Sequence, residues 1–579
     1  MRSVAFSVVF LSLVICLQTP SAAPPPLPAV PSGPLVVSER WPECTDLQSW
    51  IRDVMRLEGV EKASETAQGK VFFRWLRRFS KMATGGMIQA HEGPYGAEKY
   101  VLDAHKNLFV YGWGYCDTHS RIAEAAWSEW KKDRTSAERV ITQHSDGGYH
   151  TMFRLRLDGR YAAFDARYGY YLVEEDRPDA RILDWAEVGI DENVLKNREY
   201  KHRSQPFFEY FGREWDRTLL LKPVYYATEE EWVKAGRPEE SVFGNGQYRM
   251  GTRFHDMSFQ LPKGSVIERH WDNSARKFYV PAGREHKGEE PFLPSGRFYR
   301  VTETMFDGNW VKHDPNYRFC SPYVTQVPEN EGYNPQVRGG RTIGQAWGKW
   351  TYEAPLADSG LVRAAPVSTD LIHQEEAPYL RPAQSTGGGE AVFDFYCPYV
   401  LVDGLLNGRW EAAREDQPRV ELRALQAKLK SETDPEIWSS WQEIASGPGV
   451  FNVELGRPRF NGRDVSIHGV YRFQIRLSVT PNQVRSRPAG LSSLRLDAWF
   501  ENGLMSIPRL FAGDNTVHFK VKDSKALTAP VTVTYAYQTE SGELQHRKIL
   551  KPGDFRANTA TYHIAAPGLK RCDWLKISY

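Results

Sequence analysis

Residues 149–165 read YHTMFRLRLDGRYAAFD, and this stretch decides the fold of the segment around it. Apolar side chains alternate along its first half, on one face of an expected strand: Thr151, Phe153, Leu155 and Leu157. A period of two indicates a half-buried β-strand. Asp158-Gly159 follows, a strong signal for a two-residue hairpin turn. The turn sets the register, so that Leu157 opposes Arg160 and Phe153 opposes Phe164.

Two ionisable residues share one face of this hairpin. In the same register Met152 opposes Asp165 and His150 opposes Arg167, so His150 and Asp165 are diagonal neighbours. Diagonal partners of an antiparallel pair lie roughly 7–8 Å apart, a separation that an imidazole and a carboxylate can bridge. We therefore expect Asp165 to hold His150 in one tautomer.

A cysteine precedes this pair, at the start of an expected helix. Residues 108–116 read LFVYGWGYC. The residues that follow are spaced for one buried helix face running to about Lys132: Ile122, Ala123, Ala126, Trp127 and Trp130. Cys116 therefore lies at or next to a helix N-terminus, where unpaired amides and the helix dipole stabilise a thiolate and can bind an oxyanion. Asp117 disfavours the thiolate, and Arg121, one turn later, offsets that effect.

Cys116, His150 and Asp165 together supply a nucleophile, a base and a group that orients the base. Taken singly, each residue type is more often structural. The combination in one compact segment favours catalysis. His119 and His144 are rival bases that rank below His150, because His119 has no evident carboxylate partner and His144 precedes a pair of glycines.

The order of these residues resembles the transglutaminase-like superfamily, and most closely its bacterial secreted branch. The resemblance covers roughly residues 65–175 and is carried by Gly114-Tyr115-Cys116, His150 and the Asp-Gly-Arg turn followed by Phe164-Asp165. It implies an α+β, papain-like core with a Cys-His-Asp triad. The short spacing from Cys to His differs from that of papain-type hydrolases, where well over a hundred residues separate them.

Two positions differ from the animal transglutaminases. Tyr115 and Asp117 stand where those enzymes have Gln and Trp, so hydrolysis is favoured over protein cross-linking. The candidates for a group that assists the oxyanion are the backbone amide of Cys116 and the side chains of Asn107, Trp113 and Trp75.

The N-terminus has the layout of a secretory signal peptide over residues 1–23, with Met1-Arg2, an apolar stretch and then small residues. A proline-rich leader follows at 24–35. We therefore expect a secreted or periplasmic protein. Five cysteines follow the signal: Cys44, Cys116, Cys320, Cys397 and Cys572. An odd number leaves at least one thiol unpaired, for which Cys116 is the natural candidate, and the other four can form up to two disulfides in any of three pairings.

Composition excludes some partners. The chain has 74 basic and 72 acidic residues among 579, a formal charge of +2, and no basic run, so nucleic acid is not an expected partner. No later stretch reaches the roughly 18–20 apolar residues that span a bilayer, so no integral membrane segment is expected after signal cleavage. His255-Asp256 and Glu268-Arg269-His270 have no recognised ligand spacing, and neither a metal nor an organic cofactor is expected.

The remaining sequence predicts β-rich domains after the catalytic one. We assign residues 36–200 to the transglutaminase-like catalytic domain, 201–385 to a β-rich middle domain and 390–579 to an antiparallel β-sandwich. The sandwich rests on alternating apolar residues at 471–479 and in three later runs. A helix-like insertion is expected from Glu421 to Lys430.

These features predict a secreted cysteine enzyme that acts on a protein, peptide or cell-wall amide. Cys116 attacks the carbonyl, His150 takes and returns the proton, and water or an amine resolves the thioester. Water would make it a peptidase or amidase, and an amine would make it an acyltransferase. The alternative is a non-catalytic transglutaminase-like scaffold in an envelope or glycan-binding protein, with the C-terminal domain as the candidate glycan-binding part.

Overall fold

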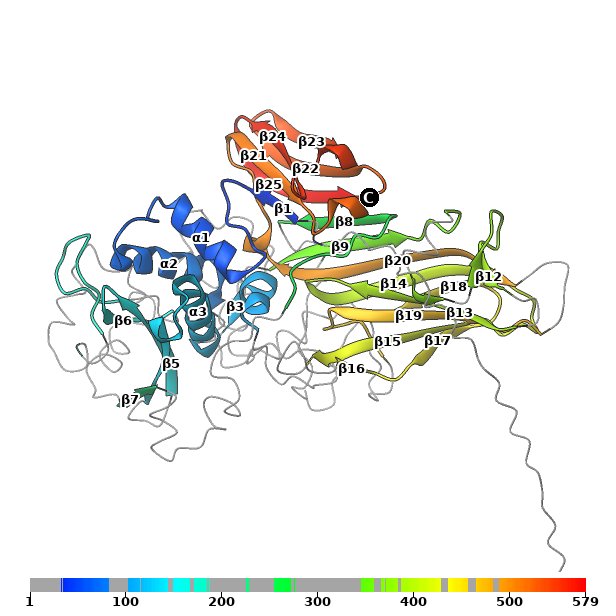
Figure 1. The fold of residues 1–579 in the computed structure, drawn as a ribbon, viewed down its shortest axis with the longest axis horizontal. Helices are drawn as coiled ribbons and strands as arrows, with labels where there is room; N and C mark the ends of the chain where they lie inside the picture. Colours follow the sequence, from blue (N-terminus) through cyan, green and yellow to red (C-terminus); the bar gives the residue numbers. More distant parts are fainter. Residues whose placement is uncertain are drawn as a thin grey trace, which may run out of the picture.

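The computed structural model describes residues 33, 35–82, 103–114, 116–143, 149–166, 171–184, 187, 225–228, 255–271, 275, 345–358, 366–369, 371–383, 387–428, 436–456, 465–482 and 489–579. The expected signal peptide, most of the leader and Cys320 lie outside these residues. Figure 1 shows a helical region beside a long β-rich body, with a smaller group of C-terminal strands against both.

Three α-helices form the helical region: α1 (Leu47–Leu57), α2 (Glu65–Phe79) and α3 (Cys116–Lys131). The first two begin at side-chain caps, because the Asp46 carboxylate accepts from the Ser49 amide and the Ser64 hydroxyl accepts from the Ala67 amide. A single-turn π-helix, η1 (Lys106–Tyr111), precedes α3. The short strands β2 (Lys81–Met82) and β3 (Trp113–Gly114) pair in parallel.

A four-stranded antiparallel sheet packs against α2 and α3, in the order β6-β5-β4-β7. Its strands are β4 (Ala137–Gln143), β5 (Tyr149–Leu157), β6 (Arg160–Phe164) and β7 (Tyr225–Thr228). The hairpin prediction is confirmed, with Leu157 opposite Arg160 and Phe153 opposite Phe164. Asp158 and Gly159 have φ of 51° and 83°, so both adopt the left-handed backbone that such a tight turn requires.

Two sheets pack face to face in the β-rich body, and the second extends into the group of C-terminal strands. One has the order β10-β13-β19-β15-β16, with β17 also on β15, and the other runs β11-β12-β20-β9-β8-β25-β22-β23, with β14 on β20 and β18 on β14. The strands of the first are β10 (Pro366–Thr369), β13 (Gly389–Tyr396), β15 (Arg419–Lys428), β16 (Glu436–Trp438), β17 (Gln442–Ser446) and β19 (Arg472–Val479). Those of the second are β8 (Ser265–His270), β9 (Gln345–Glu353), β11 (Leu371–His373), β12 (Leu380–Pro382), β14 (Val400–Glu411), β18 (Gly449–Glu454), β20 (Gly490–Gly503), β22 (Val531–Thr539), β23 (Gly542–Leu550) and β25 (Leu569–Ser578).

A third sheet joins the two ends of the described chain. In the order β1-β21-β24 it pairs β1 (Leu35–Ser38) with β21 (Gly513–Lys520), and β21 with β24 (Thr559–Ala566). Four short 3₁₀ turns complete the described elements: η2 (Arg134–Ser136), η4 (Leu504–Ser506), η5 (Ser524–Ala526) and η6 (Pro552–Asp554). Strands β8 and β9, from the expected middle domain, lie in the same sheet as strands of the expected C-terminal domain.

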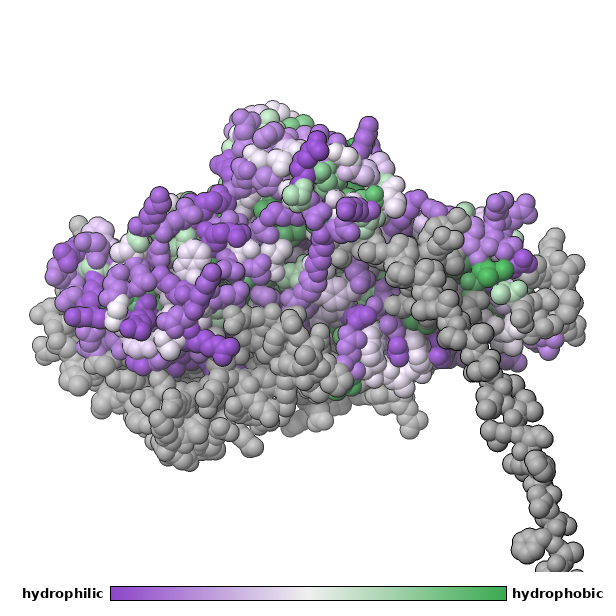
Figure 2. All heavy atoms as spheres, viewed as in Figure 1, coloured by the Kyte–Doolittle hydropathy of each residue, from purple (hydrophilic) through white to green (hydrophobic). Residues whose placement is uncertain are grey.

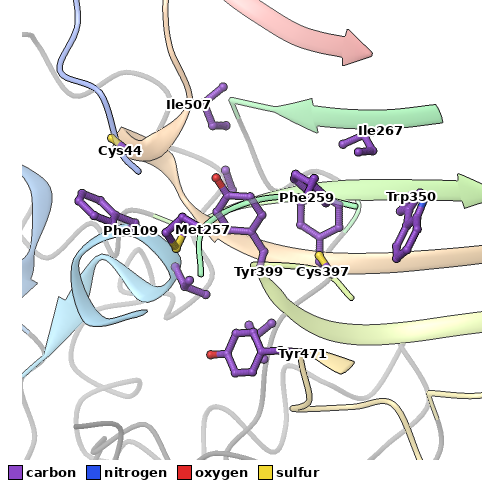
Figure 3. Close-up of a cluster of buried hydrophobic side chains, with 14 of the residues drawn as sticks. Cys44, Phe109, Met257, Phe259, Ile267, Trp350, Cys397, Tyr399, Tyr471 and Ile507 are labelled. Atoms are coloured by element: carbon purple, nitrogen blue, oxygen red, sulfur yellow. The ribbon is translucent and has the colours of Figure 1, made fainter. Parts of the chain in front are cut away.

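One apolar core runs from the helices into the β-rich body. Within the body, the Trp350 ring of β9 meets the Phe395 ring of β13 edge to face at 5.6 Å, which joins the two sheets. At the junction, Phe109 of η1 and Met257 lie beside Tyr399, with Cys44 and Ile507 close by (Figure 3). The helical region is therefore packed onto the sheets rather than tethered to them.

The expected α+β, papain-like fold is wrong, because the chain is β-rich. Strands make up 47% of the described residues, and helices are few. The α+β prediction rested on the helical pattern of the N-terminal segment. Three sheets make up most of the rest of the described chain. The helix-like insertion at Glu421–Lys430 is also wrong, since β15 covers most of it with Leu422 and Ala424 buried on alternate positions.

Candidate active site

The predicted nucleophile is the first residue of α3. This helix runs for 16 residues from Cys116 to Lys131 and packs against β4 and β5. Its N-terminus therefore carries unpaired amides and the positive end of the helix dipole at the position of Cys116. The side chain of Cys116 lies outside the described part of the structure.

His150 is the second residue of β5, the strand against which α3 packs. Its backbone pairs with Thr142 of β4. Its side chain is outside the described part, as is Arg167, which it was expected to oppose. Asp165 follows β6 directly and is completely buried. The pairing of β5 with β6 ends at Phe153 opposite Phe164, one residue before Asp165 and three residues after His150.

Four charged residues form a cluster at the first turns of α3. Arg121 Nε donates to Asp117 Oδ2 at 2.7 Å, Arg139 Nη1 donates to Asp117 Oδ1 at 3.1 Å, and Arg139 Nε donates to Glu124 Oε2 at 3.0 Å. Only 4% of the Arg121 side chain and 1% of the Arg139 side chain are exposed. Burial raises the pKa of Asp117, but the two guanidinium groups outweigh it and hold that pKa below its usual value. The cluster balances two anions with two cations, so the charge of Asp117 beside Cys116 is compensated.

The expected partner of Asp117, Arg121, does pair with it, but the sequence reasoning missed Arg139. This residue lies on β4 opposite Phe153, on the face that α3 covers. An arginine at a buried position of an alternating strand is the signal that would have identified it, because a buried guanidinium requires acidic partners.

The rival base His119 makes a hydrogen bond with the backbone at the end of α2. It is buried, and its Nε2 donates to the Ser80 carbonyl at 3.1 Å, since a carbonyl oxygen can only accept. This bond ties the first turn of α3 to the end of α2. The second rival, His144, lies outside the described residues.

Of the expected oxyanion groups, Trp75 is committed to another contact. Its indole Nε1 donates to Glu58 Oε1 at 2.7 Å, and its ring packs with Trp41 and Phe79. Asn107 lies inside η1, where its carbonyl accepts from the Gly112 amide. The side chain of Trp113 is outside the described part. The backbone amide of Cys116 stays a prediction for this role, at the N-terminus of α3.

The metal-capable residues noted in the sequence have protein partners. His255 Nε2 donates to the Pro398 carbonyl at 2.6 Å, and His270 Nε2 lies 2.7 Å from Glu268 Oε1. Asp256 pairs with Lys522 at 2.6 Å. Across the described segments, no group of three or more His, Cys, Asp or Glu residues is placed to hold a metal ion.

Three cysteines in the described part are free thiols: Cys44, Cys397 and Cys572. None of the pairings among these three is therefore formed. Burial raises the pKa of Cys44 well above its ordinary value and also raises that of Cys397. Both thiols are thus poor nucleophiles. Cys572 is only partly buried and accepts from the Leu510 amide.

The helices within the described ranges are all too short or too polar to cross a bilayer.

Comparisons with known proteins return no match to a family model and none to a curated protein. Among solved structures, a candidate β-galactosidase from Bacteroides fragilis is 12% identical, with a TM-score of 0.12 over 31% of this chain and 28% of that chain. The β-glucuronidase of Bacteroides uniformis is 11% identical, with a TM-score of 0.12 over 33% and 22%. A candidate secreted protein from Parabacteroides distasonis ATCC 8503 is 11% identical, with a TM-score of 0.15 over 40% and 89%. The match spans less than a third of the length of the first two proteins, and at such TM-scores the function must be argued from this chain alone.

Proposed function

We propose that this protein is an extracytoplasmic cysteine enzyme, transglutaminase-like in the order of its Cys-His-Asp triad, that acts on an amide bond. The observation that carries the proposal is that Cys116 is the first residue of a long helix packed against the strand that bears His150. Thiol nucleophiles are activated at helix N-termini, where the dipole favours the thiolate. The compensated charge of Asp117 removes the main electrostatic objection to a thiolate there.

The proposed reaction proceeds in two steps, formation of a thioester and its breakdown. The Cys116 thiol gives its proton to His150, and the sulfur forms a bond to the amide carbonyl carbon. As the C–N bond breaks, the leaving amine takes that proton, and a thioester remains on Cys116. Water or a second amine then attacks the thioester, His150 takes a proton from the attacking group, and the thiol is restored. Asp165 orients His150 throughout.

Selective alkylation tests the nucleophile. Iodoacetamide should label Cys116 at pH 7 faster than Cys572, and His150→Ala should slow the labelling of Cys116 at least tenfold, as read by peptide mass spectrometry. His563→Ala, at an exposed position on β24, is the matched control and should leave the rate unchanged. Equal labelling of Cys116 in the wild type and in His150→Ala would overturn the proposal.

A substrate panel distinguishes hydrolysis of the thioester from its transfer to an amine. Wild-type protein and Cys116→Ser are incubated with peptides, cell-wall fragments and an amine donor, and the products are read by mass spectrometry. A mass gain of water across a cut bond indicates a hydrolase, and incorporation of the amine donor indicates an acyltransferase. We expect hydrolysis to dominate.

A second candidate is a binding role without catalysis, favoured by one face of the six-stranded sheet. On the side away from the core, two indoles and three guanidinium groups form an Arg-Trp ladder: Arg472, Trp438, Arg423, Trp441 and Arg476. Each guanidinium carbon lies 4.5–5.3 Å from the centroid of the neighbouring indole ring. Figure 2 shows a mostly hydrophilic surface on the described part of the β-rich body, with pale residues among the hydrophilic ones.

Within the ladder, Arg423 differs from its two neighbours. Arg472 and Arg476 are paired with Asp394 and Glu421, whereas Arg423 Nε donates to the amide oxygen of Gln474 at 2.8 Å. No ion pair of Arg423 is found among the described residues. The Arg423 guanidinium lies near two indole rings, at 4.9 and 4.5 Å from their centroids, and a guanidinium without an ion pair suits a carboxylate. The ligand class that fits is a saccharide with a carboxylate.

Calorimetry with an oligosaccharide of uronic acids tests this second role. Arg423→Met should weaken binding at least tenfold, while Arg419→Met, an exposed arginine on the same strand, should not. Equal affinities for the two variants would exclude the ladder as the site.

A further inference from the structure

The π-helix η1 is held by the β-rich body at its apolar side. A Cβ placed on Gly503, the last residue of β20, would lie 2.8 Å from the Phe109 carbonyl oxygen, so η1 approaches that strand as closely as a glycine permits. Phe109, Val110 and Tyr111 are all fully buried. The backbone of η1 therefore rests directly on the end of β20.

A carboxylate holds the N-terminal end of η1. Asp103 Oδ1 accepts from the amides of His105 and Lys106, and its Oδ2 accepts from the His255 amide at 3.1 Å. His255 is held in turn, because its carbonyl lies 3.1 Å from His105 Nδ1 and its ring donates to the Pro398 carbonyl. The start of η1 is thus joined to the β-rich body through hydrogen bonds that a buried carboxylate and imidazole make together.

A pair of phenols holds the C-terminal end of η1. The hydroxyls of Tyr111 and Tyr471 lie 2.8 Å apart in a buried environment. The Tyr471 ring also lies 4.5 Å from Lys106 Nζ and packs edge to face against His255 at 4.6 Å. Tyr471, which precedes β19, therefore contacts both ends of η1 at once.

Only four residues, Gly112 to Tyr115, separate η1 from Cys116 in sequence. Gly112 ends η1 with φ of 65°, and its amide donates to the Asn107 carbonyl. The next two residues are β3, which pairs with β2. Cys116 then begins α3. With so few residues between them, a displacement of η1 moves the start of α3 as well.

We infer that the β-rich body positions the nucleophile, with Gly503 and Tyr471 as positioning residues that act through η1. This inference rests on the proposed cysteine chemistry, and it assigns a role in that chemistry to residues more than 300 positions away in sequence. The β-rich body is then a part of the catalytic apparatus rather than an appended module. Neither Gly503 nor Tyr471 is proposed to contact the substrate.

The first test replaces the glycine that η1 rests on. Gly503→Ala forces η1 away from β20, because the added methyl group meets a backbone oxygen. Gly553→Ala is the matched control, since a Cβ there meets nothing within 4 Å. We expect Gly503→Ala to lower the alkylation rate of Cys116 at pH 7 about tenfold and to shift its pH profile upward. The rate of Cys572 and the circular dichroism spectrum should remain those of the control.

A double-mutant cycle tests the phenol pair. Tyr111→Phe and Tyr471→Phe each remove one hydroxyl and keep the ring. Each should slow the alkylation of Cys116, and the double variant should be no slower than the worse single variant, because the two hydroxyls act on η1 as one contact. Additive effects in a folded protein would contradict this.

Backbone hydrogen exchange separates a failure of this inference from a failure of the proposed function. Amides of η1 and of the first turn of α3 should exchange faster in Gly503→Ala than in Gly553→Ala. Unchanged exchange and unchanged alkylation together would overturn the inference. Faster exchange in a protein whose wild-type Cys116 reacts no faster than Cys572 would support the positioning role and reject the cysteine enzyme.

Discussion

The helical region and the β-rich body are held in place by different means. In the helical region, the short elements are fixed by side-chain hydrogen bonds: Asp46 and Ser64 cap helices, Asp158 joins the hairpin to α2, and Asp117 joins α3 to β4. In the body, long strands such as β14 and β20, of 12 and 14 residues, are specified by apolar residues on alternate positions.

The difference separates two kinds of sensitivity. A capped element depends on a few polar atoms that must each find a partner. A long ladder spreads its stability over many contacts, and a single change matters only when it opens the core. The two regions nevertheless share one apolar core, so damage to either should be felt by both.

The largest expected effect comes from opening the core in either region. Trp350→Ala in β9 and Trp50→Ala in α1 each remove a fully buried indole, and each should cost about 3–5 kcal/mol of unfolding free energy. If the shared core couples the regions, calorimetry should show both variants shifting the same unfolding transition. Two transitions that move independently would show that the regions unfold as separate units.

The next effect belongs to the helical region alone. Arg139→Met leaves Asp117 and Glu124 short of a buried partner and should cost about 3 kcal/mol, measured by urea unfolding. Arg154→Met, which removes partly exposed pairs on β5, is the control and should cost less than about 1 kcal/mol. Similar costs for the two variants would show that the cluster is no more important than a surface pair.

A pH-dependent effect lies at the junction of the two regions. Burial, then the nearby Lys106 charge, lowers the pKa of His255 to about 3. The folded state therefore keeps this imidazole neutral while the unfolded state takes up a proton below about pH 6.5. Its contribution to stability is complete above pH 6.5 and declines as the pH falls toward 3, by about 2 kcal/mol between pH 6.5 and 5.

His255→Asn removes this titration and should flatten the corresponding part of the curve of unfolding free energy against pH. Urea unfolding of both proteins at several pH values checks it. An identical slope in both would mean that the imidazole does not stay neutral in the folded state.

The smallest expected effect is on the hairpin turn. Asp158→Ala removes the carboxylate that accepts from the Glu65 and Thr66 amides at 3.2 and 3.1 Å, and should cost about 1 kcal/mol. Asp158→Asn keeps a hydrogen-bond acceptor and tolerates the left-handed backbone, so it should cost less unfolding free energy than Asp158→Ala. Thermal melts of the two variants rank them. Loss of the hairpin register in the alanine variant would show that Asp158 contributes more to stability than these two hydrogen bonds indicate.

Local patterns predicted local structure well. Asp158-Gly159 determined a hairpin whose register is confirmed, and the alternation at 471–479 marked β19 with Phe473, Ile475 and Leu477 buried. The start of α3 at Cys116 is also confirmed. These succeed because turn chemistry and hydrophobic period act between near neighbours in sequence.

Where tertiary context decides, the sequence predicted less. Glu421–Lys430 is rich in good helix formers, which predict a helix, yet β15 pairs with β19 as far as Ala424 and buries Leu422 and Ala424. Arg139 was missed because its acidic partners come from another element. The fold class was wrong because the pairings of β8 with β25 and of β1 with β21 connect residues that no local pattern relates.

The pairing of β1 with β21 has a consequence for how the chain is made. Val36 lies opposite Phe519, so β1 can pair with β21 only after the roughly 480 residues between them have been synthesised. At about 5–20 residues per second, that delay is roughly half a minute to a minute and a half. During that interval the edge of β1 has no β21 with which to pair. A chain interrupted before β21 therefore keeps an open strand edge that chaperones or proteases can recognise.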